Sequence, residues 1–285
     1  MSLLFAIVLA AWSAGDPAPD TAMTNSVIPP VAIDSAKSQV PVDSVVGRPH
    51  PNRRCRLVPS KEPWSTTDWI VLGSLPVATA LLTFADEPLR DFAQENRNDA
   101  TANLAVVPKA IGDIRYTGPV VGLLWWAGSQ GRAPRLAQAS VNALEAWTLT
   151  QAVTQAAKYT VGRSRPFRNE GNLEFSGVVI MDDSRHSFPS GHTATAWGLI
   201  PAYAMEYSDH PWISGALWAV AVTVPASRIH DDMHWLSDCA FSAGVGWLSN
   251  RAVRAWEMSH GEKSGTTALI LPTGDGFVAR VAQSF

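Results

Sequence analysis

The sequence predicts an all-α protein, a helical bundle with about six principal helices. From Trp64 onward, long uncharged apolar segments alternate with short polar ones, and no strand-rich block or internal repeat lies among them. Of the 285 residues, 46% are hydrophobic and only 16% are charged. A chain of this length and composition can bury one sizeable apolar core.

The predicted helices follow the apolar runs along the chain. The longest charge-free runs have 17 residues, just under the ~20 that a membrane-spanning helix needs. They also contain Ser, Thr, Gly and Pro, so they fit a soluble or only partly embedded bundle somewhat better than a protein with six full spans. The 12 tryptophans suit a buried core or a membrane interface equally. The expected helices cover residues 69–85, 116–131, 136–162, 193–205, 211–227 and 239–250.

The two ends of the chain differ from the bundle. An apolar run followed by small residues near the N-terminus predicts a secretory signal peptide, although its n-region lacks Lys and Arg and a short buried or anchoring helix is the alternative. Export would place the protein in the periplasm or cell envelope. The expected divisions are a signal peptide over residues 1–14, a linker or loosely ordered, disordered arm over 15–63, a helical domain over 64–260 and a C-terminal β-hairpin tail over 261–285.

Charge and cysteine content limit the partners. The net charge is −3 and no basic block is present, so nucleic acid is not an expected partner. Cys55 and Cys239 are the only cysteines, and both a disulfide between them and two unpaired, half-buried thiols remain open. The oligomeric state has no signal in the sequence.

A first chemical motif is Pro189-Ser190-Gly191-His192, which opens one of the apolar runs. Pro and Gly predict a tight turn into a helix, and Ser190 suits the cap. The first amides of such a helix point outward unpaired and bind phosphate or a similar oxyanion. Taken alone, the tetrapeptide also fits an ordinary capped helix with an exposed histidine.

Three cations are expected at the same end of the bundle. Lys158 and Arg165 lie seven residues apart, and Arg228 follows His192 by 36 residues. That distance accommodates about two 15-residue helices and a turn, so the chain returns to the end at which it began. Two arginines and a lysine around a helix N-terminus predict a site for a tetrahedral oxyanion.

The stretch SRIHDDMHWLSD, residues 227–238, supplies the remaining chemistry. His234 and Asp238 are four residues apart, so they share a helical face, where the carboxylate can orient the imidazole for attack. His192 can protonate the leaving oxygen, which completes a phosphohistidine mechanism without a metal. Alternatively, His230, Asp231, Asp232 and His234 form a metal cluster. The nearby cations argue against a divalent ion and assign the first three of these residues to the rim.

Three ordered motifs together resemble the signature of the type 2 phosphatidic acid phosphatase superfamily, which includes bacterial acid phosphatases and vanadium haloperoxidases. The resemblance covers roughly residues 64 to 257. It implies a phosphate pocket of Lys158, Arg165, Ser190, Gly191 and Arg228, with His234 as nucleophile, Asp238 as its partner and His192 as general acid. The motifs are Lys158-x6-Arg165-Pro166, Pro189-Ser190-Gly191-His192 and Ser227-Arg228-x5-His234-x3-Asp238.

The resemblance implies a metal-independent phosphatase acting on a phosphorylated small molecule or lipid, with no cofactor and with vanadate as an inhibitor. Two alternatives remain: a haloperoxidase that uses vanadate as cofactor, and a non-catalytic envelope protein that keeps the fold. The substrate is open among soluble esters, phosphatidic acid, polyprenyl pyrophosphates and glycolipid phosphates. A further group of basic residues suits either substrate contact or, more often, solvated loop charges: Arg163, Arg168, Arg185 and His186.

Overall fold

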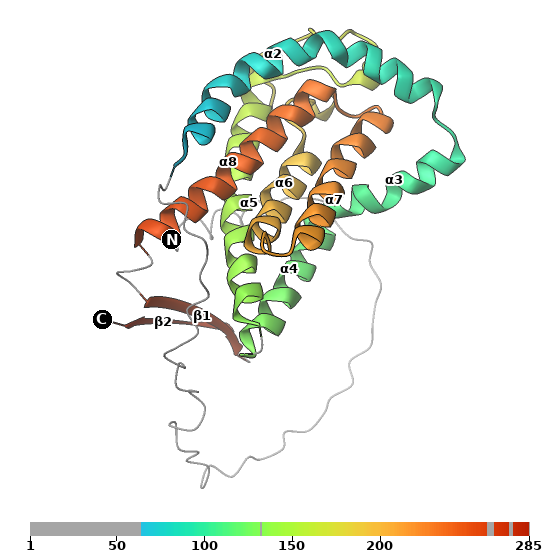
Figure 1. The fold of residues 1–285 in the computed structure, drawn as a ribbon. Coiled ribbons are helices and arrows are strands. Elements are labelled where there is room, and N and C mark those ends of the chain that lie inside the picture. The colour runs from blue at the N-terminus through green and yellow to red at the C-terminus, as the bar shows by residue number, and fades with distance from the viewer. Residues whose placement is uncertain (1–63, 132, 261–264, 274–275, 285) are drawn as a thin grey trace, which may run out of the picture. The chain divides into compact units, whose positions relative to one another are not determined.

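The computed structural model describes residues 64–131, 133–260, 265–273 and 276–284, and it confirms the all-α fold class (Figure 1). The predicted signal peptide and N-terminal arm lie outside the described residues. The helical domain begins at Ser65, which caps the first described helix in a capping box with Asp68. The prediction of domain boundaries over the whole chain therefore stays a prediction.

The described residues contain seven α-helices, and two short 3-10 helices lie between α5 and α6. Six of the seven correspond to the predicted runs, and α2 and α8 each extend ten residues beyond the predicted C-terminal end. Their bounds are α2 (Thr66–Glu95), α3 (Asp99–Ile111), α4 (Ile114–Ser129), α5 (Pro134–Val161), α6 (Gly191–Glu206), α7 (Pro211–His230) and α8 (Leu236–His260).

Helix α3 is the helix that the sequence analysis missed. It is short, contains Pro108, and begins at a capping box in which Asn98 and Thr101 bond each other's backbone amides. Its apolar residues do not form an uncharged run like those of the other helices, because Asp99 and Lys109 lie near its ends. It packs on α7, and Gly112, directly after its last residue, lies against His192 at the start of α6.

The bundle is built around α6, which packs against α5, α7 and α8 (Figure 1). Small residues allow these helices to approach closely. A Cβ added at Gly198 of α6 would lie 2.9 Å from the Trp147 Cα of α5, and one at Gly246 of α8 would lie 2.6 Å from the Trp197 backbone. Glycine at these two contacts therefore sets the spacing of α6 from both neighbours. The core beside α6 consists of Val121, Ala139, Ala143, Leu199, Ala202 and Tyr203.

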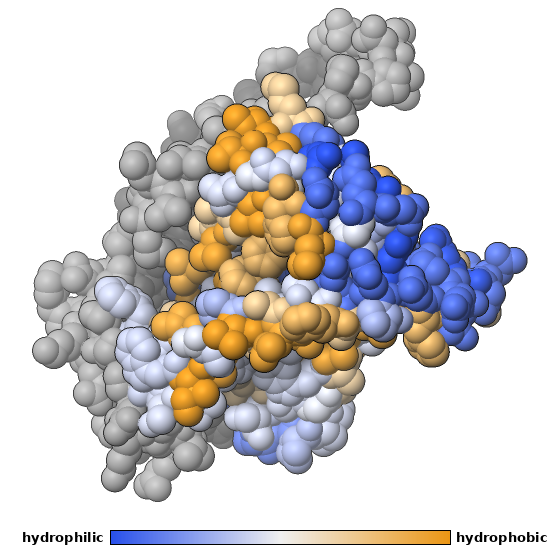
Figure 2. Space-filling model, turned by 90° about the horizontal axis from the view of Figure 1, so that it is seen from above, coloured by the Kyte–Doolittle hydropathy of each residue, from blue (hydrophilic) through white to orange (hydrophobic). Residues whose placement is uncertain are grey.

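Two described helices, α2 and α7, are long and apolar enough to cross a membrane by length and composition. Only 6% of the apolar window of α2 is buried inside the chain. Figure 2 shows apolar side chains gathered over one area of the molecular face, next to a hydrophilic area. These features fit association with a membrane. Large exposed apolar side chains of α2 include Trp69, Ile70, Val77, Leu81 and Phe84.

After α8, strands β1 (Gly265–Thr273) and β2 (Gly276–Ser284) pair antiparallel, with Gly265 opposite Ser284. The side chains of both strands and the two residues between them lie outside the described part. Of the two cysteines, Cys239 is a buried free thiol, whereas Cys55 lies outside the described residues.

Candidate active site

All eight predicted site residues lie where four helix ends meet. Lys158 is in the last turn of α5, Gly191 begins α6, Arg228 is in the last turn of α7, and Asp238 is in the first turn of α8. His234 lies in the short connection between α7 and α8. The out-and-back path predicted from the chain length therefore brings the three motifs together at one end of the bundle.

The segment between α5 and α6 lies across this end of the bundle, and its residues contact one another. It starts at Gly162, whose positive φ of 59° ends α5 in the left-handed region, where a Cβ would lie 2.3 Å from the Gly177 carbonyl oxygen. Arg168 binds Ser184 and Glu170, so it joins two parts of the segment. His186 is buried, and its ring nitrogen Nε2 contacts the Val179 carbonyl. The His186 ring also packs edge-on against Tyr159 near the C-terminal end of α5, so His186 is not the solvated charge that the sequence suggested.

The N-terminus of α6 has the geometry expected of an oxyanion site. Ser190 is the N-cap, and its buried hydroxyl accepts a hydrogen bond from the Thr193 amide at 3.5 Å. The next residue, Gly191, has no side chain to shield the first amides. A Cβ added there would lie 3.7 Å from the Lys158 Cε, so the lysine side chain passes directly over this turn. The helix end and one cation therefore face the same space.

His234 is almost fully buried and is held by a backbone carbonyl. Its Nδ1 lies 2.6 Å from the Ser187 carbonyl oxygen, and a carbonyl only accepts hydrogen bonds, so Nδ1 carries the proton. Nε2 is then the basic nitrogen. Burial, followed by the charges of Lys158, Arg165 and Arg228, lowers the pKa of His234 well below its usual value. The imidazole is therefore neutral near pH 7, as a nucleophile must be.

Asp238 does not orient His234 in the way the sequence predicted. Its Oδ2 lies 3.9 Å from the His234 Nδ1, which is too long for a hydrogen bond. Instead, Oδ2 accepts from the Ser187 hydroxyl at 2.6 Å and from the Trp235 amide at 2.9 Å. Asp238 thus holds Ser187, and the Ser187 carbonyl holds His234. The carboxylate therefore acts on His234 through one intervening residue.

Sequence reasoning missed the group that holds Asp238 in place. Arg163, with 2% of its side chain exposed, donates to the Asp238 Oδ1 at 2.6 Å and to the Asp86 Oδ2 at 2.7 Å. Asp86 comes from α2 and also accepts from the Ser237 amide and hydroxyl. This buried network links α2 to the start of α8. Arg163 lies inside the first motif, but nothing in one sequence separates Asp86 from an ordinary polar residue that ends an apolar run.

The three predicted cations surround His234, and each is partly engaged by the protein. The Lys158 Nζ donates to the His186 carbonyl at 2.8 Å, which leaves two of its three hydrogens for a ligand. Burial, followed by the Arg165 charge, lowers the pKa of Lys158 to about 8. Arg165 binds both carboxylate oxygens of Asp183 at 2.8 Å. Arg228 donates to Asp231 at 3.1 Å, and its buried Nε has no hydrogen-bond partner among the described residues.

His192 lies on the first turn of α6, on the side where α3 ends. A Cβ added at Gly112, the C-cap of α3, would lie 2.8 Å from the His192 Cβ. Burial, followed by the Arg228 charge, lowers the pKa of His192 to about 4. Bound phosphate brings negative charge to the cations that lower this pKa, and it therefore favours protonation of His192.

The residues assigned to the rim each have a protein partner. Asp231 pairs with Lys109 at 3.1 Å as well as with Arg228, and the ring of His230 contacts the Thr101 hydroxyl at 3.0 Å. Asp232 has a positive φ of 58° and binds the Arg90 guanidinium through both oxygens. Within the described part of the chain, no three His, Cys, Asp or Glu side chains are arranged to hold a metal ion.

Fold and site together define a class: all-α proteins that gather a helix N-terminus, three cations and two histidines at one end of a bundle. Residues 139–261 match the family model described as the PAP2 superfamily. The resemblance found in the sequence is therefore confirmed.

One curated relative is the lipid A 1-phosphatase of Porphyromonas gingivalis, 31% identical over 180 residues that cover 61% of this chain. The match spans 36% of that relative's length. Two solved structures are also similar. A transmembrane PAP2-type phosphatidylglycerolphosphate phosphatase from Bacillus subtilis has a TM-score of 0.49 and 17% identity, covering 65% of this chain and 95% of its own. LpxE from Aquifex aeolicus has a TM-score of 0.45 and 16% identity, covering 59% and 94%.

Proposed function

We propose that this protein hydrolyses the phosphoric monoester of a membrane lipid through a phosphohistidine intermediate, without a metal ion. The observation that carries the proposal is the setting of His234. The Ser187 carbonyl holds Nδ1–H, so Nε2 has a lone pair, and three cations lie around the same ring. A neutral nucleophile beside a cationic pocket suits attack on a phosphate dianion.

The first step transfers the phosphoryl group to the protein. The His234 Nε2 attacks phosphorus, a nitrogen–phosphorus bond forms, and the bond from phosphorus to the ester oxygen breaks. His192 gives its proton to that oxygen, which leaves as the lipid alcohol. Lys158, Arg165, Arg228 and the first amides of α6 stabilise the negative charge of the pentacoordinate transition state.

The second step regenerates the enzyme. His192, now neutral, accepts a proton from water as the water oxygen attacks phosphorus. The nitrogen–phosphorus bond breaks, its electron pair returns to the His234 Nε2, and inorganic phosphate leaves. The proton taken up by His192 replaces the one it gave in the first step, so the cycle balances.

A lipid substrate is supported by the exposed apolar surface of α2 and by the two helices of membrane-crossing length. The named activity of the P. gingivalis relative points to the same substrate class. The site then lies at a membrane surface, where a headgroup phosphate reaches the helix ends while the lipid chains remain among apolar side chains. Secretion to the periplasmic side is part of the proposal.

Phosphate release from the full-length protein in detergent and EDTA tests the proposal. The substrates are p-nitrophenyl phosphate, a phosphatidate, a polyprenyl pyrophosphate and a lipid A 1-phosphate. Wild type and the His210→Ala control, which alters a half-exposed histidine that begins α7 at the opposite end of the bundle, are expected to release phosphate from at least one lipid. His234→Ala is expected to release none.

A rapid-quench experiment addresses the intermediate. Wild type mixed with the lipid substrate and quenched within one turnover is expected to carry one phosphoryl group on His234, located by mass spectrometry. Turnover that stops in EDTA and returns with a divalent metal contradicts the metal-free mechanism. Undiminished turnover by His234→Ala removes the nucleophile assignment. Vanadate is expected to inhibit, and halide oxidation with bound vanadate would instead indicate a haloperoxidase.

A further inference from the structure

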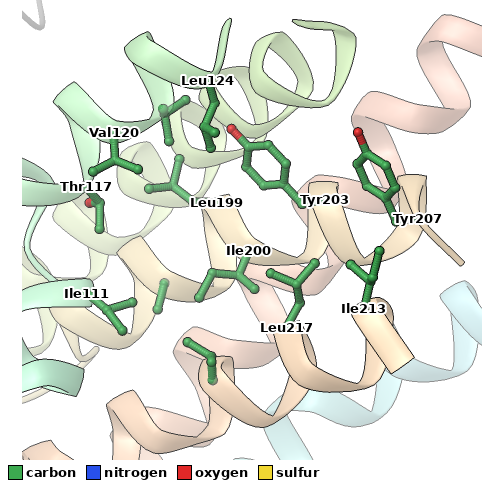
Figure 3. A pocket seen from close by; sticks show the side chains of 13 residues that line it. Ile111, Thr117, Val120, Leu124, Leu199, Ile200, Tyr203, Tyr207, Ile213 and Leu217 are labelled. Carbon is green, nitrogen blue, oxygen red and sulfur yellow. The ribbon is translucent and has the colours of Figure 1, made fainter. Parts of the chain in front are cut away.

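An apolar groove of about 440 Å³ runs between α4, α6 and α7, and the last residue of α3 lies at one end of it (Figure 3). None of the side chains that line it is charged. Ile200 of α6 and Leu217 of α7 are among the aliphatic side chains that line it. Its volume lies in the range of about 300–1,000 Å³ typical of small-molecule sites.

One end of the groove begins beside the candidate active site. Ala196 lines the groove and lies four residues after His192, so the two share one face of α6. Ile111 also lines it and is followed by Gly112, which packs against the His192 Cβ. The apolar surface therefore starts one helical turn below the proposed proton donor.

The other end of the groove is closed by two fixed tyrosines. The hydroxyl of Tyr203 donates to the Ser140 Oγ of α5 at 3.0 Å. The ring of Tyr207 lies 4.9 Å from the Arg135 guanidinium, which also binds Asp209. Figure 3 shows Tyr207 and Ile213 at the end opposite Ile111. Beyond Tyr207 the surface is charged, so the apolar lining stops there.

We propose that this groove binds one hydrocarbon chain of the lipid substrate and that Tyr207 marks the end of that chain. This inference rests on the proposed function and extends it, because it assigns the chain as well as the phosphate. A lipid chain is the occupant because the lining is continuous, elongated and uncharged, and because it starts next to His192. One wall is α7, which is long and apolar enough to cross a membrane, so a chain can enter from the lipid.

The geometry sets a chain length. Ala196 and Tyr207 are eleven residues apart in the sequence, which corresponds to about 16 Å along a helix. An extended chain advances roughly 1.2 Å per bond, so about 13 carbons fill this distance. Each buried methylene is expected to strengthen binding about fourfold until the groove is full. Longer chains gain little, because they meet Tyr207 and the charges behind it.

Non-hydrolysable n-alkyl phosphonates of 6 to 18 carbons test the groove without any turnover. Calorimetry on the wild type in a short-chain detergent is expected to show affinity rising with chain length and levelling off near 13 carbons. Leu217→Trp is expected to abolish the rise, because the indole occupies the groove. The matched control is Val222→Trp on the same helix, where the side chain is 57% exposed and does not line the groove, and the rise is expected to persist.

Tyr207→Ala tests the far end, and it is expected to move the plateau to longer chains by at least two carbons. An unchanged plateau overturns the role of Tyr207, and an intact rise in Leu217→Trp overturns the groove. If Leu217→Trp does not fold, Ile213→Trp near the end of the groove serves in its place. If phosphonate binding depends on chain length but no lipid releases phosphate, only the proposed function is contradicted. If the wild type releases phosphate but its affinity for the phosphonates does not change with chain length, only the groove proposal is contradicted.

Discussion

The two walls of the candidate active site are built on different principles. The inner wall consists of Asp86, Arg163, Ser187, Ser237 and Asp238, and all of these side chains are buried. The outer wall consists of the cations Lys158, Arg165 and Arg228 with the acids Asp183 and Asp231. Here the partners reach the surface, and the side chain of Asp183 is 81% exposed.

The difference separates what stays fixed from what is exchanged during turnover. On the inner wall each carboxylate accepts three or more hydrogen bonds at 2.6 to 2.9 Å, so its position is determined by the fold. On the outer wall, the exposed Asp183 carboxylate binds Arg165, which a bound phosphate would also contact. Only the Asp183 side of this pair is exposed to solvent screening, so a phosphate can replace that carboxylate at a lower cost than on the inner wall. Under the proposed function, the inner wall therefore positions His234, and the outer wall receives the substrate.

The largest expected effect comes from breaking the inner wall with Arg163→Met. The change leaves two carboxylates buried without their shared cation, and loss of one partner of a buried pair costs about 3–5 kcal/mol. We expect a lower melting temperature and a fall in kcat much larger than any change in KM, because His234 loses its support. Thermal unfolding and steady-state kinetics measure the two effects.

Arg163→Lys is the matched variant for this prediction. Lysine keeps the charge but cannot reach both carboxylates with a planar fork, so partial recovery of stability and kcat is expected. Unchanged kcat in a folded Arg163→Met protein would show that the network supports only the fold, and that Asp238 needs no anchor for catalysis.

Asp238→Asn is expected to have the next largest effect, and it separates direct from indirect support of His234. In a serine protease triad, where the carboxylate itself binds the histidine, the equivalent change lowers kcat by about 10⁴. Here the Ser187 carbonyl holds Nδ1–H, and Asp238 lies 3.9 Å away. We therefore expect a smaller loss in kcat, about 10- to 100-fold, since one charge-assisted support of Ser187 is weakened.

Ser187→Ala is the control for that experiment, because it removes the hydroxyl that Asp238 binds and keeps the carbonyl that His234 needs. It is expected to retain more activity than Asp238→Asn. A loss near 10⁴ in Asp238→Asn would instead indicate that Asp238 moves into contact with His234 when substrate is bound.

The fold was predictable because its signal is repeated along the chain. Long apolar runs separated by short polar segments identify six helices. The helix α3 escaped because a short segment with Asp99, Pro108 and Lys109 lacks such a run. Helix ends were also misplaced, since α2 continues to Glu95 through charged residues, of which Asp86 is buried and Arg90 binds Asp232.

The grouping of the eight predicted site residues at one end of the bundle was predictable, because they stand in three compact motifs separated by helix-length segments. What remained hidden is the connection between the motifs. The contact of Arg163 with Asp86 joins residues 77 positions apart, and the bond from His234 to Ser187 uses a backbone carbonyl. Every residue has the same backbone carbonyl, so only the folded structure shows which carbonyl holds His234.

Lys158 of the outer wall is expected to give the activity a pH dependence of intermediate size. Its pKa is lowered to about 8, so the ammonium is charged below that pH and loses its proton above it. We expect kcat/KM, which reports the free enzyme, to fall as pH rises through about 8. Bound phosphate stabilises the ammonium, so kcat is expected to fall only at higher pH.

Lys158→Arg checks this assignment, because an arginine stays charged across the whole range. The alkaline limb of kcat/KM is expected to move to higher pH in that variant, whereas Lys109→Arg at the rim leaves the limb in place. If Lys158→Arg does not move the alkaline limb, that limb belongs to another titrating group. Lys158 would then keep its charge in the free enzyme at pH 8.

Asp183→Asn is expected to have the smallest effect, and its sign decides how the outer wall works. The amide no longer competes for Arg165, so phosphate is expected to inhibit about two- to fivefold more tightly, which is the range for losing one exposed ion pair. The gain is expected to shrink at high salt, because salt screens the exposed pair more than the buried site. Asp182→Asn is the matched control, since that carboxylate binds Ser184 and lies near Arg185 rather than a pocket cation. Weaker inhibition in Asp183→Asn alone would mean that the carboxylate positions Arg165 for phosphate, and the outer wall would then be as fixed as the inner one.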